Sequence, residues 1–282
     1  MKIKAYAKIN LALNVIGKRD DGYHDLDMIM VPINLYDKLT FTFNDQDILI
    51  FNGKRIKNYE NNTIYRSIVL LREAFKFKEH FLVKVEKRIP MQAGLAGGSA
   101  DGAATLKAVN QMCNLGLDEE QLINFGKQIG ADVPFTLVAR PCRVKGIGEK
   151  LEDLNLTEDL EVLLVKPIEG VSTKDAFGKL NYDTCVHPDI DLITQRINAN
   201  EPYEDLLDNT LEAVAIELVP PIKVIEDELK ACGLKKVLMS GSGSSVFALG
   251  THDDLVKAWE LMKKNKHFVK LTHIISGSAY RE

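Results

Sequence analysis

Residues 90–104, Pro-Met-Gln-Ala-Gly-Leu-Ala-Gly-Gly-Ser-Ala-Asp-Gly-Ala-Ala, carry the clearest chemical signal in the sequence. Gly94, Gly97 and Gly98 leave several backbone N–H groups free of side-chain bulk, so an anion can approach them closely. No Gly-Lys-Ser/Thr follows, which excludes a Walker A loop, and the glycine spacing does not fit a dinucleotide-binding fingerprint. The stretch predicts a phosphate-binding loop; the simpler alternative is a flexible turn before a capped helix.

The loop stands between a predicted strand at 81–86 and a predicted helix that ends near Asn114. Ser99 is expected to cap this helix, whose N-terminus carries a partial positive charge and unpaired N–H donors. Such a helix start is a favourable place for a phosphate, so loop and helix together form the predicted site.

Three polar side chains in apolar surroundings are candidates for catalysis. Lys8 and Asn10 lie two residues apart on a predicted strand, so they point to the same side and could reach one ligand together. The alternative is two solvated side chains on a half-exposed strand. Asp132 follows the end of a predicted helix at Gly130, where it is either a site carboxylate or the cap of a local turn.

Tyr23 and His24 follow a polar turn. Together they offer a flat face and a donor and acceptor pair, which suits a planar heterocycle. A histidine after a turn is more often only a surface residue, so the pair alone is a weak signal.

A second turn rich in glycine and serine contains Gly241, Ser242 and Gly243 between two apolar segments. It is either a plain hairpin or a brace for the phosphate loop, because it exposes backbone donors and hydroxyl groups.

The hydrophobic pattern predicts the elements that position these residues. Predicted strands lie at 1–16, 39–43, 48–51, 81–86, 160–167 and 268–275, and on both sides of the Gly/Ser turn within 236–249, with an Asn-Gly hairpin turn at 52–53. Predicted helices run from a cap at 61–63 to Phe75 (buried face Ile64, Ile68, Leu71 and Phe75), from Asp118 to Gly130, around Phe177, and over 189–198, 203–217, 220–231 and 253–264. Helices and antiparallel-looking strands mix without a regular βαβ rhythm, so the predicted class is α+β.

The chain has 282 residues, enough for one large or two modest domains. A turn at 146–149 precedes an acidic stretch at 152–159 that is typical of an exposed connection. We therefore place a domain boundary between residues 155 and 156, which gives predicted domains of 1–155 and 156–282.

Composition excludes several classes of protein. A net charge of −4 and a pI near 5.9 argue against a nucleic-acid partner. No run of about eighteen apolar residues predicts a membrane span, and the alternating N-terminus does not resemble a signal peptide. The cysteines are scattered without a C-x-x-C pair, which indicates reduced thiols in a cytoplasmic protein rather than disulfides or a zinc site.

The pattern Pro-x-x-x-Gly-Leu-x-x-x-Ser-Ala-x-x-Ala-Ala at 90–104 resembles the ATP-binding loop of the GHMP kinases, a family of small-molecule kinases. Four further motifs are similar to that family and follow its order, so the resemblance spans essentially the whole chain. They are Ala-Lys-Ile-Asn-Leu (7–11), Asp-Gly-Tyr-His (21–24), Gly-Ala-Asp-Val-Pro (130–134) and Met-Ser-Gly-Ser-Gly (239–243). The first two are the most specific, and they resemble members that act on a cytidine diphosphate-linked methylerythritol.

The resemblance implies a two-domain GHMP kinase fold, with an N-terminal domain like domain 2 of ribosomal protein S5 and a C-terminal ferredoxin-like α/β sandwich. It implies ATP-dependent phosphorylation of the 2-hydroxyl of the methylerythritol moiety, in the non-mevalonate route to isoprenoid precursors. The implied cofactors are ATP and Mg²⁺. The expected partner is that small molecule, with no nucleic acid and no membrane, and the expected state is a monomer or homodimer.

The resemblance also implies roles for individual residues. Asp132 would be the base that faces the hydroxyl, with Lys8 beside it, and Asn10 would position the substrate. The cytosine would lie near Tyr23 and His24, with Phe177 as a stacking partner. The ATP-binding positions would be Asn62, Lys87 and Ile89 at the adenine end, followed by Pro90, Gly94, Leu95, Ala96, Gly97, Gly98, Ser99 and Ala100. Ser99 is the one hydroxyl of the loop that could meet the metal, and Gly241, Ser242 and Gly243 would brace the site.

The sequence departs from the family pattern at Ala100, where a second serine is common, and at Ser244, where a proline is common. Two other functions stay open. Another GHMP kinase, acting on mevalonate, a phosphomevalonate, homoserine or a sugar, is disfavoured by the Tyr23-His24 pair, because those substrates have no base to stack. A non-catalytic regulator with this fold, binding RNA for example, is disfavoured by intact Lys8 and Asp132 and by the acidic pI.

Overall fold

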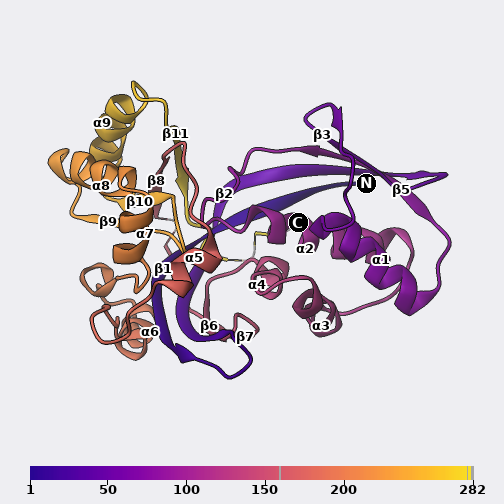
Figure 1. The fold of residues 1–282 in the computed structure, drawn as a ribbon, viewed down its shortest axis with the longest axis horizontal. Helices are drawn as coiled ribbons and strands as arrows, with labels where there is room; N and C mark the ends of the chain where they lie inside the picture. Colours follow the sequence, from indigo (N-terminus) through magenta and orange to yellow (C-terminus); the bar gives the residue numbers. More distant parts are fainter. Residues whose placement is uncertain (159, 278, 281–282) are drawn as a thin grey trace. The chain divides into compact units, whose positions relative to one another are not determined.

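The computed structural model of the chain describes residues 1–158, 160–277 and 279–280 (Figure 1). They form two compact units, each built from separate stretches of chain. The first unit comprises residues 1–7, 35–89 and 96–139, and the second comprises 8–34, 90–95 and 140–282. The boundary between 155 and 156 falls inside the second unit and stays a prediction.

The first unit contains a sheet in the order β4-β3-β5-β2. Its strands are β2 (His24–Asn44), β3 (Ile48–Phe51), β4 (Lys54–Arg55) and β5 (His80–Glu86). β5 is antiparallel to residues 38–44 of β2 and parallel to β3. The hairpin between β3 and β4 turns at Asn52 and Gly53, both with positive φ, which is why the predicted Asn-Gly pair suits it.

Four helices complete the first unit: α1 (Thr63–Phe75), α2 (Gly97–Met112), α3 (Glu119–Ile129) and α4 (Val133–Val138). α2 packs against the other three (Figure 1). α1 begins as predicted, because the Asn62 side chain accepts a hydrogen bond from Ile64 N at 2.9 Å. Phe75 was expected in the buried face of α1 but is 40% exposed.

Ser99 does not cap α2, contrary to the prediction. The residue before the helix is Ala96, which has φ of 55° and forms no side-chain cap bond. Ser99 is the third residue of the helix, since Gly97 and Gly98 already adopt helical conformation.

The second unit contains an antiparallel four-stranded sheet in the order β11-β8-β10-β9. The strands are β8 (Glu161–Lys166), β9 (Lys236–Met239), β10 (Val246–Leu249) and β11 (Phe268–His273). The helix α8 (Pro221–Ala231) packs against β9 and β10, and α9 (His252–Met262) packs against β8 and β11 (Figure 1). A βαββαβ order with this strand arrangement is ferredoxin-like, as expected.

The remaining helices of this unit are α5 (Thr173–Gly178), α6 (Ile190–Ala199), a 3₁₀ turn η1 (Glu204–Leu206) and α7 (Glu212–Leu218). The single helix predicted over 203–217 is therefore wrong. The chain leaves helical conformation at 207–211, where the side chain of Asn209 accepts from Leu211 N and donates to the carbonyls of Met239 and Gly241.

Two strands run from one unit into the other, β1 (Lys2–Lys18) and β2. Within the second unit, residues 26–30 of β2 pair with β6 (Cys142–Gly146), which pairs with β7 (Lys150–Asp153). The predicted acidic connection at 152–159 thus starts as the end of β7, and its residue 159 lies outside the described residues. Both units combine helices with strands, which confirms the α+β class. Among the described residues, no helix has the length and apolar character needed to cross a bilayer.

Candidate active site

Residues 90–95, the first part of the glycine-rich stretch 90–104, belong to the second unit and are held by the Gly/Ser turn between β9 and β10. Ser240 Oγ donates to the carbonyl of Gly94 at 3.2 Å, and Ser245 N donates to the carbonyl of Ala93 at 3.2 Å. Gly94 has φ of +71°, and a Cβ at this position would lie 2.0 Å from the carbonyl oxygen of Ser240. A side chain cannot fit there, so the backbone of the loop packs directly on the backbone of the turn.

The tip of the Gly/Ser turn also approaches Lys8 and Asn10. A Cβ on Gly241 would lie 3.1 Å from Lys8 Nζ and 3.2 Å from Asn10 Oδ1. Asn209 Nδ2 donates to the carbonyl of Gly241 at 2.9 Å. Sequence reasoning missed Asn209, because its position inside a predicted helix gave no sign of this long-range contact.

The next two residues of the turn contact its surroundings in different ways. Ser242 Oγ lies 2.9 Å from Thr173 Oγ1, at the start of α5. Gly243 has φ of +87°, and a Cβ there would lie 2.6 Å from Met239 Sδ. Gly241 and Gly243 therefore both occupy positions where a larger residue would be strained.

Lys8 and Asn10 form a buried pair on β1. They are 4% and 1% exposed, and Lys8 Nζ donates to Asn10 Oδ1 at 2.6 Å. Asn10 Nδ2 donates to Met28 Sδ at 3.3 Å, and Asn10 N donates to Ser240 Oγ at 3.2 Å. The alternative of two solvated side chains is wrong, and the pair is tied to the turn that holds the loop.

Asp132 and Ser99 lie in the first unit. Asp132 is half-buried directly before α4, and its side chain forms no cap bond with that helix, so capping does not account for it. Ser99 Oγ lies 4.0 Å from the position of a Cβ on Gly130. In the described part of the chain, no group of three or more His, Cys, Asp or Glu side chains could cage a metal ion.

Residues 87–89 meet the start of α2. Lys87 Nζ donates to Asp101 Oδ2 at 2.7 Å and to Asp37 Oδ2. Ile89 is buried, and its Cγ2 would lie 2.9 Å from a Cβ on Gly97. Sequence reasoning missed Asp37 and Asp101, because a carboxylate inside a strand or helix pattern does not reveal its partner.

The charges in this cluster are strongly perturbed. Burial raises the pKa of Asp101 to about 7, although the Lys87 ammonium acts in the opposite direction. Burial opposes the charge of Lys87 as well, but Asp101 and Asp37 outweigh it and raise the pKa of that ammonium. Lys87 therefore stays charged at neutral pH.

His24 stacks with two aromatic side chains of the second unit. Its ring centroid lies 4.7 Å from that of Phe177, at an interplanar angle of 33°, and 6.4 Å from that of Tyr182, at 16°. Burial, and then the nearby Lys18 charge, lower the pKa of His24, so the imidazole is neutral at pH 7. Tyr23 is 58% exposed and does not share this stack, while Tyr182 was not found from the sequence.

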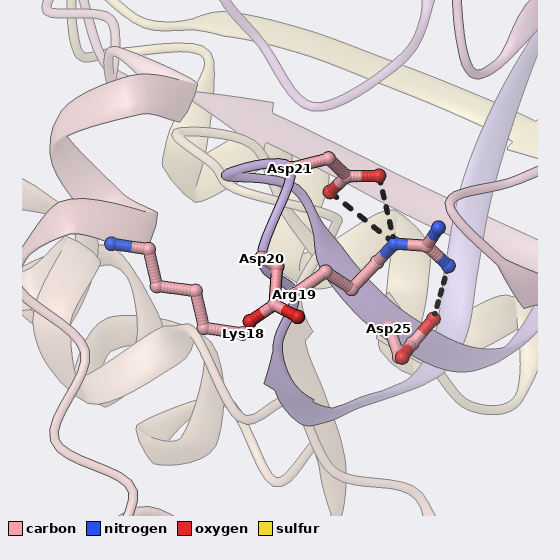
Figure 2. A pocket seen from close by; sticks show the side chains of 5 residues that line it. All are labelled: Lys18, Arg19, Asp20, Asp21 and Asp25. Carbon is pink, nitrogen blue, oxygen red and sulfur yellow. Dashed lines mark hydrogen bonds and ion pairs between the residues drawn. The ribbon is translucent and has the colours of Figure 1, made fainter.

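The turn before His24 lines a polar depression (Figure 2). Its lining residues are Lys18, Arg19, Asp20, Asp21 and Asp25. Arg19 reaches between Asp21 and Asp25, at 3.1 Å from each, while Lys18 points away from both (Figure 2). Asp21 Oδ1 also accepts from Tyr23 N at 3.0 Å. The aspartate of the Asp-Gly-Tyr-His motif thus orders the turn that leads into His24.

Two family models match the chain. The model for the GHMP kinases N terminal domain matches residues 62–140, and the model for the GHMP kinases C terminal region matches 185–267. The two matches lie on either side of the boundary predicted between 155 and 156.

Similar proteins cover nearly the whole chain. A 4-diphosphocytidyl-2-C-methyl-D-erythritol kinase of Bacillus cytotoxicus is 40% identical over 256 residues, 89% of this chain and 88% of that protein. The protein of the same name from Clostridium beijerinckii is 39% identical over 98% of this chain and 100% of its own length.

Solved structures of known proteins are also similar to this chain in fold. A crystal structure of 4-(cytidine 5'-diphospho)-2C-methyl-D-erythritol kinase has a TM-score of 0.80 and 32% identity, covering 97% of this chain and 99% of that chain. A homoserine kinase from Cytophaga hutchinsonii has a TM-score of 0.73 at 19% identity, over 98% of this chain and 96% of its own, and shares the fold alone. The chain therefore belongs to the GHMP kinases and, among them, to the family of the 4-diphosphocytidyl-2-C-methyl-D-erythritol kinases.

Proposed function

We propose that this chain transfers the γ-phosphoryl group of ATP to the 2-hydroxyl of 4-diphosphocytidyl-2-C-methyl-D-erythritol, in the non-mevalonate route to isoprenoid precursors. Family membership makes it an ATP-dependent kinase that phosphorylates an alcohol. The main support for this substrate is the sequence identity of 39–40%, over 89–98% of the chain, with relatives named 4-diphosphocytidyl-2-C-methyl-D-erythritol kinase. The stack of His24 on Phe177 adds support, because a neutral imidazole beside an aromatic ring suits a pyrimidine base.

In this proposal Asp132 accepts the proton of the attacking hydroxyl. Lys8 supplies an ammonium that offsets charge developing on the transferring group. Asn10 fixes Lys8 Nζ through the 2.6 Å hydrogen bond and orients the substrate. These roles rest on the matching motifs, and the burial of Lys8 and Asn10 supports them.

The backbone N–H groups of the loop and of the first turn of α2 are proposed to hold the phosphates of ATP, since helix N-termini favour anions. Mg²⁺ would neutralise negative charge on the phosphates of ATP. Mg²⁺ usually keeps several waters and needs only one or two protein ligands beside the phosphates, so the single Ser99 hydroxyl fits this role without a protein cage. Asn62, Lys87 and Ile89 are proposed for the adenine end.

Cytosine recognition is proposed for Tyr23, His24 and Phe177, with Tyr182 extending the aromatic stack. The cysteines that the structure describes are all free, which suits the proposed cytoplasmic location. Neither a nucleic acid nor a membrane is part of the proposal, and the monomeric or homodimeric state remains a prediction.

The test is direct: purified protein, Mg-ATP and the cytidylylated methylerythritol, with the product identified by mass. Mevalonate, phosphomevalonate and homoserine serve as competing acceptors. We expect a gain of one phosphoryl group on the cytidylylated substrate and no product from the others. Phosphorylation of a competing acceptor alone would refute the proposed substrate.

The assigned base is tested by Asp132→Asn, which should lower kcat by roughly two to four orders of magnitude while ATP affinity and folding persist. Lys8→Met should resemble it, and the double variant should be little worse than either, because the pair acts as a unit. Asp118→Asn is the matched control, since asparagine caps a helix as well as the aspartate that caps α3. Turnover of Asp132→Asn within a few-fold of wild type would remove Asp132 from this role.

A further inference from the structure

Asp37, on β2, uses its carboxylate to organise one short segment of chain. It is fully buried. Its Oδ1 accepts from the backbone N–H groups of Arg88 and Ile89, the latter at 2.9 Å, and its Oδ2 accepts from Lys87 Nζ. All three donors lie in residues 87–89, which connect β5 to the phosphate loop along the chain.

The same segment is fixed from α2. Lys87 Nζ donates to Asp101 Oδ2 at 2.7 Å, and a Cβ on Gly97 would lie 3.7 Å from Lys87 Nζ. The Lys87 side chain is 17% exposed, so its position is set by the two carboxylates rather than by solvent. The ammonium therefore has a fixed place beside the first turn of the helix.

This arrangement leaves one acceptor unused. Asp101 is 3% exposed, and its buried Oδ1 has no hydrogen-bond partner among the residues that the structure describes. Such a group is destabilising, since buried polar atoms are normally paired. The charged groups that act on Asp101 are Lys87 and Asp37, so the cluster balances one ammonium against two carboxylates.

We propose that Asp37 is a positioning residue for nucleotide binding: it holds the Lys87 ammonium and the backbone of 88–89 in the arrangement that ATP requires. ATP as the ligand rests on the proposed function. Without the carboxylate, Lys87 loses one of its two anchors and the N–H groups of Arg88 and Ile89 lose their acceptor. ATP then has to order this segment as it binds, which weakens affinity.

A second buried aspartate provides a matched control. Asp47 is 8% exposed and accepts from Phe81 N at 3.0 Å and from Arg72 Nη1 at 2.8 Å. Asp47 thus binds the backbone at the beginning of β5, whereas Asp37 binds the backbone just after the end of that strand. Asp47→Asn and Asp37→Asn thus remove the same charge from the same unit, but only Asp37 contacts residues 87–89.

The experiment measures ATP affinity by titration calorimetry, the melting temperature, and kcat and both KM values for each variant. Both substitutions should lower the melting temperature. Only Asp37→Asn should raise the Kd and KM for ATP, by about tenfold as expected for one charged hydrogen bond, with the KM of the alcohol substrate unchanged and kcat within a few-fold. Lys87→Met should give a similar loss, and the double variant should be less than additive.

An equal rise in the Kd for ATP in Asp47→Asn would overturn the proposal, because the effect would then be one of stability. Unchanged ATP affinity in Asp37→Asn would overturn it as well. If Asp37→Asn does not fold, Lys87→Met decides: normal ATP affinity in that variant refutes the positioning role. Wild-type protein that does not bind ATP would instead refute the proposed function.

Discussion

Gly94→Ala should separate the contact between loop and turn from the general strain of a left-handed residue. Gly94 has φ of +71°, which an alanine adopts only with strain. Its new Cβ would also lie 2.0 Å from the oxygen and 3.0 Å from the carbon of the Ser240 carbonyl. Both are backbone atoms, so no flexible side chain can move aside, and the loop has to leave the turn.

The size of the effect follows from its parts. The left-handed conformation costs an alanine about 1–2 kcal/mol. Loss of the hydrogen bond from Ser240 Oγ to the Gly94 carbonyl costs about 1 kcal/mol more. Gly116→Ala isolates the first part, because Gly116 has φ of +70° with nothing within 4 Å of its Cβ position. At about 2–4 °C per kcal/mol, we expect Tm to fall by about 2–8 °C for Gly116→Ala and by about 4–12 °C for Gly94→Ala.

Differential scanning calorimetry and an ATP-coupled activity assay read the two consequences separately. Gly116→Ala should keep full activity, whereas Gly94→Ala should lose most of its kcat/KM even well below its melting temperature. If the two variants melt together and Gly94→Ala retains wild-type activity, the close packing of loop and turn is not required.

Three other substitutions test separate regions. Gly97→Val would place a branched side chain against Ile89, whose Cγ2 lies 2.9 Å from the Cβ position of residue 97. ATP affinity measured by calorimetry should fall at least about tenfold while the circular dichroism spectrum is unchanged. Normal affinity would remove Gly97 from the proposed phosphate site. His24→Ala breaks the stack with Phe177 and should reduce both turnover of the cytidine substrate and its preference over the uridine analogue, and unchanged values of both would leave His24 a surface residue. Burial, and then the nearby Glu226 carboxylate, raise the pKa of Glu212 from 4.5 to about 7. Between these pH values the folded state holds a proton that the unfolded state releases, so the free energy of unfolding should decline as pH rises from about 4.5 to about 7. Denaturant titrations of Glu212→Gln should show a flatter profile over that range, and a slope equal to that of wild type would refute the shift.

Local patterns predicted most elements, because their signals are contained in neighbouring residues. Asn62 and Asp118 both cap the helices that they were expected to start. The apolar periodicity of α8 and α9 placed them within a residue or two. The prediction that Ser99 caps α2 was wrong because the helix begins two residues earlier, at Gly97 and Gly98. Glycine has a low intrinsic preference for helix, so nothing in the sequence indicated this earlier start.

The residues of the candidate site that the sequence did not reveal have one thing in common: each contacts a residue that is distant in sequence. Asp37 lies 52 positions from Ile89, and Asn209 lies 32 from Gly241. Tyr182 joins a stack with His24 that begins more than a hundred residues earlier. The glycine spacing alone predicts a phosphate-binding role for the loop, which stays a prediction, whereas the side chains that hold the loop could be found only in the fold.

Residues 90–95 have one further consequence, for any attempt to divide the protein. They lie in the N-terminal half of the sequence, yet Ala93 and Gly94 accept hydrogen bonds from Ser245 and Ser240. A fragment ending at residue 155 would carry the glycine-rich segment without these donors. Expressed alone it should not bind nucleotide well, and activity should return only when the two halves are produced together. We therefore expect a chimera of relatives to work best when segments 90–95 and 240–245 come from the same parent.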